Sequence, residues 1–234
     1  MINSLNRNSQ FLLNLSTNVL IYLVLLLLGL WFTPFLIHHL GVANYGLYPL
    51  ANSMMNYMTL ISLALNGAVG RYITIDLKKE NYESANRTFN TSLFGSLFIW
   101  GVATPVILLF LRFLPSIFNI PQGSENDARL LFFFILMSFF VAMISSCFSV
   151  STWAKSRFDL KNAVILPMNL IRVFTVPLLF HLLTPSIWHI GFSILVSSLF
   201  GLFGDYYLSR KLTPELNISY KLFDHSRLKD LTSM

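Results

Sequence analysis

The sequence has few charged residues and a single cysteine, and these shortages already exclude several classes of protein. Charged residues make up 11% of the 234 residues, against roughly 25% in an ordinary soluble domain. Too few polar side chains therefore exist to coat a soluble globule of this size. Because Cys147 stands alone, no intramolecular disulfide is possible, and no thiol metal site is indicated.

Signals of catalysis are scarce as well. The chain has no Gly-Lys-Ser/Thr phosphate-binding loop, and no deep pair of carboxylates offers acid–base chemistry. None of the 5 histidines has a metal-ligand partner four residues away, although zinc held by outer-surface histidines remains a minor alternative. We expect a protein that is not an enzyme and that needs no cofactor or metal.

Long apolar segments are what the chain has instead. Apolar residues make up 55% of it, with 22 phenylalanines. Crossing a hydrocarbon layer of about 30 Å takes roughly 20 helical residues, and period-2 alternation is absent, so helices are expected. We predict an all-α, polytopic membrane bundle over residues 1–208, followed by a cytoplasmic linker or tail over 209–234. Its six transmembrane helices lie near 11–36, 45–69, 88–112, 130–152, 162–183 and 187–208.

The net charge of +6 is concentrated in alternate connecting segments. If the N-terminus is inside, every basic residue except Arg112, Arg129 and Arg172 falls on the cytoplasmic side. This is the positive-inside pattern, so the charge indicates topology rather than nucleic-acid binding. It predicts a multi-pass protein of the bacterial inner (plasma) membrane, with the N-terminus and the C-terminus cytoplasmic.

Polar side chains form a stripe along each of the first two predicted spans. One consists of Asn14, Asn18, Tyr22, Gly29 and Thr33; the other consists of Tyr45, Tyr48, Asn52, Asn56, Thr59 and Asn66. In lipid such a stripe must face either a neighbouring helix or water. Hydrogen bonding between helices is one interpretation. For the second span we favour a hydrated cavity, because its polar side chains exceed what packing needs.

Small residues recur at helical spacing in the fourth and sixth spans, at Ser138, Ala142, Ser145, Ser149 and Thr152 and at Ser193, Ser197, Gly201 and Asp205. Such residues let helices approach closely, so they are interpreted as packing positions. Cys147 is interpreted in the same way. Asp205 is expected near the cytoplasmic surface, one turn from Arg210, where a carboxylate is easily hydrated.

Arg172 is the most unusual residue, because it lies about 15 Å into the fifth span by helix rise. An arginine at that depth costs at least about 2.5 kcal/mol and normally faces a cavity or a partner. Asn169 lies one turn away, and Pro167 and Pro177 flank the segment. One interpretation is an arginine that caps carbonyls freed by the prolines. The other is that Arg172 presents its charge to an anionic substrate, since a guanidinium suits phosphate.

Several short motifs follow one another along the chain: TPFL at 33–36, LGVANYGLY at 40–48, GRY at 70–72, FNIP at 118–121, SRFDLKN at 156–162 and KLTP at 211–214. In this order they resemble the motifs of polysaccharide (O-antigen) flippases of the multidrug/oligosaccharidyl-lipid/polysaccharide exporter superfamily. The resemblance implies two pseudo-symmetric lobes around a central cavity. It also implies an undecaprenyl-pyrophosphate-linked oligosaccharide as the substrate, moved from the inner to the outer leaflet for O-antigen or lipopolysaccharide biosynthesis.

Under this resemblance, the chain corresponds to the N-terminal lobe alone. Its expected partners are the anionic lipid-linked oligosaccharide, membrane lipid and a second lobe, either a separate chain or a homodimer mate. The residues expected to meet substrate are Tyr22, Asn52, Asn56, Thr59, Asn169 and Arg172. Two alternatives stay open: a multidrug or cation-coupled exporter of the same fold, and a truncated, non-transporting membrane fragment.

Overall fold

A computed structural model describes residues 7–224, except for the side chains of Arg7 and of residues 61–66. Over this range the chain is helical and contains no strand. Its elements, in order, are α1 (Arg7–Tyr45), α2 (Leu47–Lys78), α3 (Tyr82–Ile117), α4 (Glu125–Ala154), α5 (Phe158–Leu182), α6 (Trp188–Leu212) and the 3₁₀ turn η1 (Tyr220–Leu222).

Local signals in the sequence set several helix boundaries. The side chain of Asn81 accepts a hydrogen bond from the backbone N–H of Ser84 at 3.2 Å, which caps the start of α3. Gly41 has a φ of 74°, and this left-handed conformation breaks α1 near its end. Lys78 lies in the last turn of α2, where a cation favours the helix dipole.

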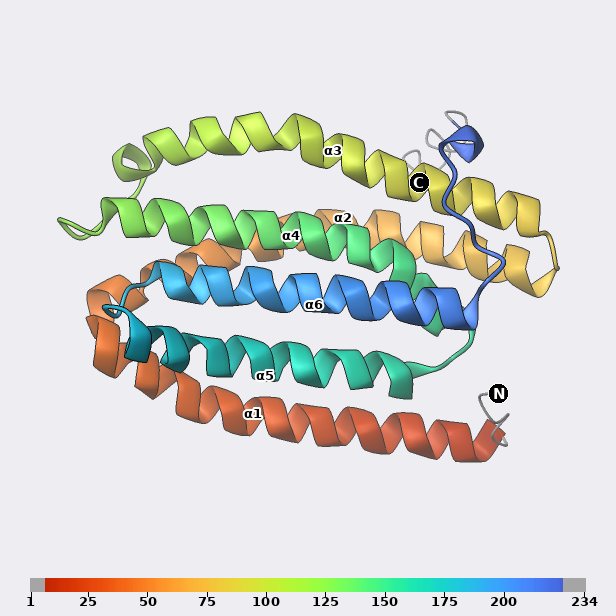
Figure 1. Ribbon diagram of the computed structural model, residues 1–234, viewed down its shortest axis with the longest axis horizontal. Helices are drawn as coiled ribbons and strands as arrows, with labels where there is room; N and C mark the ends of the chain where they lie inside the picture. Colours follow the sequence, from red (N-terminus) through yellow and green to blue (C-terminus); the bar gives the residue numbers. More distant parts are fainter. Residues whose placement is uncertain (1–6, 225–234) are drawn as a thin grey trace.

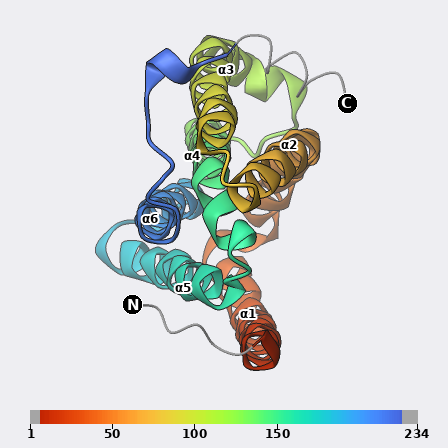
Figure 2. The same cartoon turned by 90° about the vertical axis from the view of Figure 1, so that its right-hand side faces the viewer.

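The helices lie lengthwise beside one another, with α4 in the middle (Figures 1 and 2). Helices α6, α5 and α1 follow on one side of α4, and α2 and α3 lie on the other. Helix α1 packs mainly on α5 and touches α2 little. The turns at 79–81 and 155–157 share one end with segment 213–224. We call this end of the bundle the basic end, and we call the other end the opposite end.

Close approach between α4, α5 and α6 depends on glycines. A Cβ added to Gly191 would lie 2.8 Å from the carbonyl oxygen of Leu131 on α4, and one added to Gly201 would lie 2.5 Å from Sδ of Met168 on α5. Ser138 and Ser193 are buried as well, and Cys147 is buried on α4 beside Ser92 of α3. The interpretation as packing positions is confirmed for these residues, whereas Ala142 of the same stripe is exposed.

Five of the described helices are long and apolar enough to cross a membrane: α1 from Asn8, α3, α4, α5 and α6. The structure thus confirms an all-α membrane bundle. The second predicted span, 45–69, also forms a continuous helix, α2 of 32 residues, but it is not among these five. Six spans were predicted, and five of them are supported by helices of sufficient length and apolar character, whereas α2 is a long helix that does not meet this criterion.

Candidate functional site

Arg172 lies on α5 and contacts a side chain of α2. Its Nη2 donates a hydrogen bond to the hydroxyl of Tyr48, and its Cζ lies 5.7 Å from the centroid of the same ring. Arg172 is half-buried, about 15 Å from the end of α5 at Leu182 by helix rise. Among residues 7–224, none of the ion pairs includes Arg172. Its charge therefore has only a neutral phenol as partner.

The alternative role for Arg172 was to cap carbonyls freed by Pro167 and Pro177. Within the described part of the chain, its side-chain hydrogen bond goes to Tyr48 and not to a backbone carbonyl. Asn169 takes the local role instead, because its amide donates to the carbonyl of Ile165 at 2.9 Å. The amide nitrogen of Asn169 is thus engaged within its own helix rather than with Arg172.

The predicted stripe on α2 continues from Tyr48 along one helix face. Asn52 is half-buried and Asn56 is exposed, and no hydrogen bond between described residues reaches either side chain. Thr59 is half-buried and donates to the carbonyl of Met55 at 2.8 Å. The two amides therefore stay available to water or to a ligand, whereas the hydroxyl of Thr59 is satisfied within α2. The side chain of Asn66 lies outside the described residues.

The stripe on α1 behaves differently. Asn14 donates to the carbonyl of Ser156 at 3.0 Å and accepts from the backbone N–H of Asp159 at 3.1 Å. Asn162 donates to the side chain of Asn18 at 2.9 Å. These bonds join α1 to α5, so interhelical hydrogen bonding is confirmed here. Tyr22 is 74% exposed, and no contact between described residues joins it to Tyr48 or Arg172.

A second charged cluster, absent from the sequence prediction, lies where α4, α5 and α6 meet near the basic end. Nζ of Lys161 lies 2.7 and 2.6 Å from the two carboxylate oxygens of Asp205, and the hydroxyl of Ser145 donates to one of them at 2.6 Å. The carboxylate side chain is only 2% exposed. The expectation of a hydrated Asp205 at the surface was wrong, because a lysine on another helix neutralises it inside the bundle.

Further polar contacts tie the helices together at the basic end. The hydroxyl of Ser151 on α4 lies 2.9 Å from that of Ser209 on α6 and 2.6 Å from that of Thr213. Between α4 and α5, Arg157 pairs with Asp159 at 2.8 Å. Hydrogen bonding to this carboxylate raises the pKa of Arg157 above its ordinary value. These contacts are mutually satisfied, so they are interpreted as structural.

Part of the predicted tail lies along α3. Asn86 donates to the carbonyl of Glu215 at 2.8 Å and accepts from the N–H of Asn217 at 2.7 Å. One turn on, Asn90 donates to the carbonyl of Asn217 at 2.8 Å and accepts from the N–H of Ser219 at 2.7 Å. Each amide thus satisfies a donor and an acceptor of the extended segment, which is held on α3.

No group of three or more His, Cys, Asp or Glu side chains in the described range is placed to hold a metal ion. What the structure does define is an integral membrane protein of several apolar helices. Polar contacts join its helices, and an arginine with a neutral partner lies between α2 and α5.

A curated bacterial relative belongs to the same broad class. The chain is 27% identical over 226 residues to an uncharacterized membrane protein, EpsK, of Bacillus subtilis strain 168. The similarity covers 95% of this chain but 44% of that protein, so the chain spans less than half of its relative's length. No family model matches the sequence, and no solved structure matches it.

Proposed function

We propose that this chain is one lobe of a membrane transporter that moves an anionic, undecaprenyl-pyrophosphate-linked oligosaccharide across the bacterial inner membrane for polysaccharide biosynthesis. The observation that carries the proposal is Arg172, a half-buried cation held by Tyr48 without a carboxylate partner in the described residues. A purely structural arginine at this depth would be expected to have its charge neutralised.

The chemistry of the pair suits a pyrophosphate. A guanidinium is always charged, and its planar donors bind phosphate oxygens in pairs. The Tyr48 hydroxyl uses its oxygen to accept from Arg172, which leaves its own proton free for an oxygen of the substrate. The amides of Asn52 and Asn56 continue along α2 and supply neutral donors of the kind that bind sugar hydroxyls.

The proposed second lobe is supported by length. The relative of Bacillus subtilis is more than twice as long as the part that this chain matches. Helix α1 also has large apolar side chains exposed along one face, among them Leu20, Leu23, Leu27 and Trp31. A second lobe, either a separate chain or another copy, would contact lipid-linked substrate together with α2 and α5.

Two other functions are less well supported. A cation-coupled exporter needs a carboxylate that is free to bind the ion, and the buried carboxylate of Asp205 is occupied by Lys161. A non-transporting fragment would not need an uncompensated arginine in its interior. Transport measurements decide between these alternatives.

The test is export of lipid-linked oligosaccharide by a complete two-lobe system that contains this chain. Arg172→Ala should abolish export while the protein remains inserted and abundant. Arg172→Lys should retain part of the activity, since the charge survives and the paired donors are lost. Arg71→Ala, at an exposed arginine near the basic end of α2, is the matched control and should export normally.

Normal export by Arg172→Ala would refute the substrate contact. Loss of the protein from the membrane in that variant alone would instead favour a structural role for the pair with Tyr48. Tyr48→Phe separates the two, because it removes the hydroxyl and keeps the ring. It should weaken export severalfold and leave the amount of protein unchanged.

A further inference from the structure

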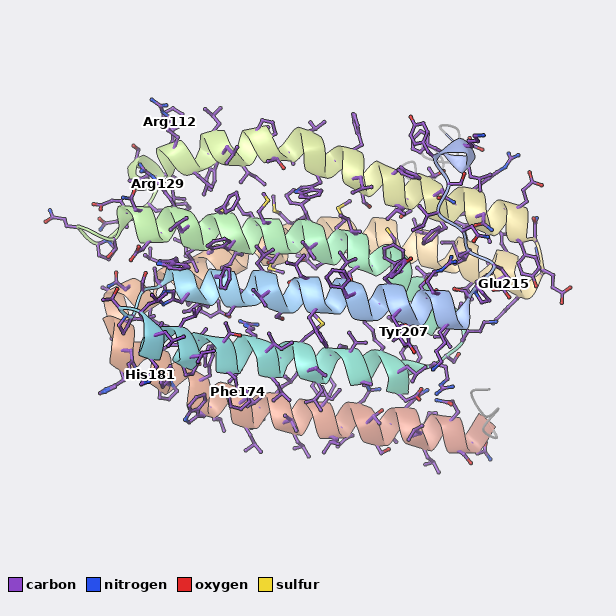
Figure 3. The ribbon with its side chains drawn as sticks, viewed as in Figure 1. Arg112, Arg129, Phe174, His181, Tyr207 and Glu215 are labelled. Atoms are coloured by element: carbon purple, nitrogen blue, oxygen red, sulfur yellow. The ribbon has the colours of Figure 1, made fainter. Side chains whose placement is uncertain are left out.

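Two arginines meet at the opposite end of the molecule, far from the basic end. Arg112 near the end of α3 and Arg129 near the start of α4 line one shallow pocket together with Leu108 and Leu111. Figure 3 shows the two arginines at the same end of their helices, with Arg112 on the outer side of α3.

No described residue forms an ion pair with the arginines of this pocket. Arg129 donates one hydrogen bond, from Nη1 to Asn126 at 3.3 Å, and its Nε is buried without a partner. The nearby carboxylate of Asp127 is engaged by Ser186 at 2.6 Å. Two guanidinium groups thus share one pocket with donors to spare.

The position of this pair is unexpected from topology. If the basic end is cytoplasmic, Arg112 and Arg129 lie at the outer ends of α3 and α4, on the side of the membrane where positive charge is normally avoided. The turn between α3 and α4 brings the two arginines together, and two guanidinium groups in one pocket repel each other unless an anion lies between them. Their convergence indicates a shared anionic partner.

We propose that Arg112 and Arg129 bind the phosphate of an anionic phospholipid headgroup in the adjoining leaflet. The pocket wall is apolar at Leu108 and Leu111, and α3 continues with exposed Val106, Leu109 and Phe113 on its surface. A phospholipid can place its phosphate on the arginines and its acyl chain along these side chains. A free phosphate would gain nothing from the apolar wall. The pocket lies on α3 and α4, so it is distinct from the Tyr48–Arg172 pair.

Lipid retention by the purified chain tests this proposal. We would titrate the detergent-solubilised chain with phosphatidylglycerol and with phosphatidylcholine and count bound lipids by native mass spectrometry. The chain should bind phosphatidylglycerol about tenfold more tightly, because phosphatidylcholine offers the same phosphate but its choline cation is repelled by the two arginines. The double variant Arg112→Gln/Arg129→Gln should lose this preference, whereas Arg71→Gln should keep it.

Two further measurements make the result decisive. Arg112→Lys/Arg129→Lys retains both charges and should keep most of the preference, even if the glutamine variant is too unstable to purify. Inorganic phosphate should compete only weakly with phosphatidylglycerol. Equal binding of both lipids by the unmodified chain, an unchanged preference in the glutamine variant or a lost preference in the lysine variant would overturn the proposal. Complete displacement by inorganic phosphate would also overturn it, in favour of a free-anion site.

Discussion

Helix α5 carries two basic side chains inside the bundle, and the protein treats them in opposite ways. Near the basic end, Lys161 meets both oxygens of Asp205, and Ser145 completes the carboxylate's hydrogen bonds. Further along, Arg172 meets only the hydroxyl and ring of Tyr48. The first site is electrically neutral and joins three helices. The second has no counter-charge among the described residues, so one helix carries both a neutralised cation and an unneutralised one.

The largest expected effect is a loss of stability when the neutral Lys161–Asp205 pair is broken. Asp205→Ala should destabilise the protein by about 3–5 kcal/mol, because Lys161 would remain partly buried without its counter-charge. The measurement is the thermal midpoint of the purified protein in detergent. The midpoint is determined from the loss of the monodisperse peak on heating.

A double variant is the control for this prediction. Lys161→Met/Asp205→Leu removes both charges, and replacing a buried ion pair with apolar side chains is often neutral or stabilising. It should therefore recover most of the midpoint lost in Asp205→Ala. If the single variant is as stable as the unmodified chain, the pair contributes nothing to the junction of α4, α5 and α6.

An intermediate effect is expected at Ser145, which donates to the same carboxylate at 2.6 Å. Ser145→Ala should destabilise the protein by about 1.5–3 kcal/mol, the usual range for a hydrogen bond to a charged group. Ser146→Ala on the next position is a matched control, since the hydroxyl of Ser146 donates to the Met143 carbonyl of its own helix and not to Asp205 in the described structure. Equal midpoints for the two variants would contradict the prediction.

A small effect on stability is expected at Arg172, although transport should be lost there. Arg172→Met removes the bond to Tyr48, worth up to about 3 kcal/mol. It also removes a membrane-embedded charge that costs at least about 2.5 kcal/mol. The two terms offset each other, so the thermal midpoint should move little. A fall as large as that of Asp205→Ala would show that the two cations of α5 are both structural.

The contrast between these sites also shows what a sequence can and cannot predict. Apolar length and the absence of alternation predicted the helices, and small-residue spacing predicted packing positions on α4 and α6 without showing which helices they contact. Arg172 was recognisable because its charge is out of place within its own segment. The Lys161–Asp205 pair was not, because each residue lies near a helix end and 44 positions separate them. Periodicity places residues on helix faces, but only packing decides which faces meet.

The same limit applies to the polar stripes. Both were recognised from spacing, yet Asn14 and Asn18 bond to neighbouring residues while the amides of Asn52 and Asn56 do not. Tyr22 shares the α1 stripe with the first pair, but it is 74% exposed. One pattern in the sequence therefore covers packed, available and exposed side chains.

The stripe on α2 gives the last prediction, which concerns accessibility and leaves stability nearly unchanged. Single cysteines at Asn52, Asn56 and Thr59, on a Cys147→Ser background, should react with a charged, water-soluble thiol reagent if this face is hydrated. Cys147 is buried beside Ser92, so a serine should be tolerated there. Asn56 is exposed and should react fastest, since the thiolate forms only where water reaches it.

Three other positions on α2 separate water from lipid and from packing. Leu60 is 63% exposed but apolar, so a cysteine there should be protected if it faces lipid. Met54 and Met58 pack against the core and should react more slowly than Asn56. If Asn56 and Leu60 are protected equally, the stripe does not face water. In that case the Tyr48–Arg172 pair would lie beside lipid or protein, and a hydrated route for an anionic substrate along α2 would have to be abandoned.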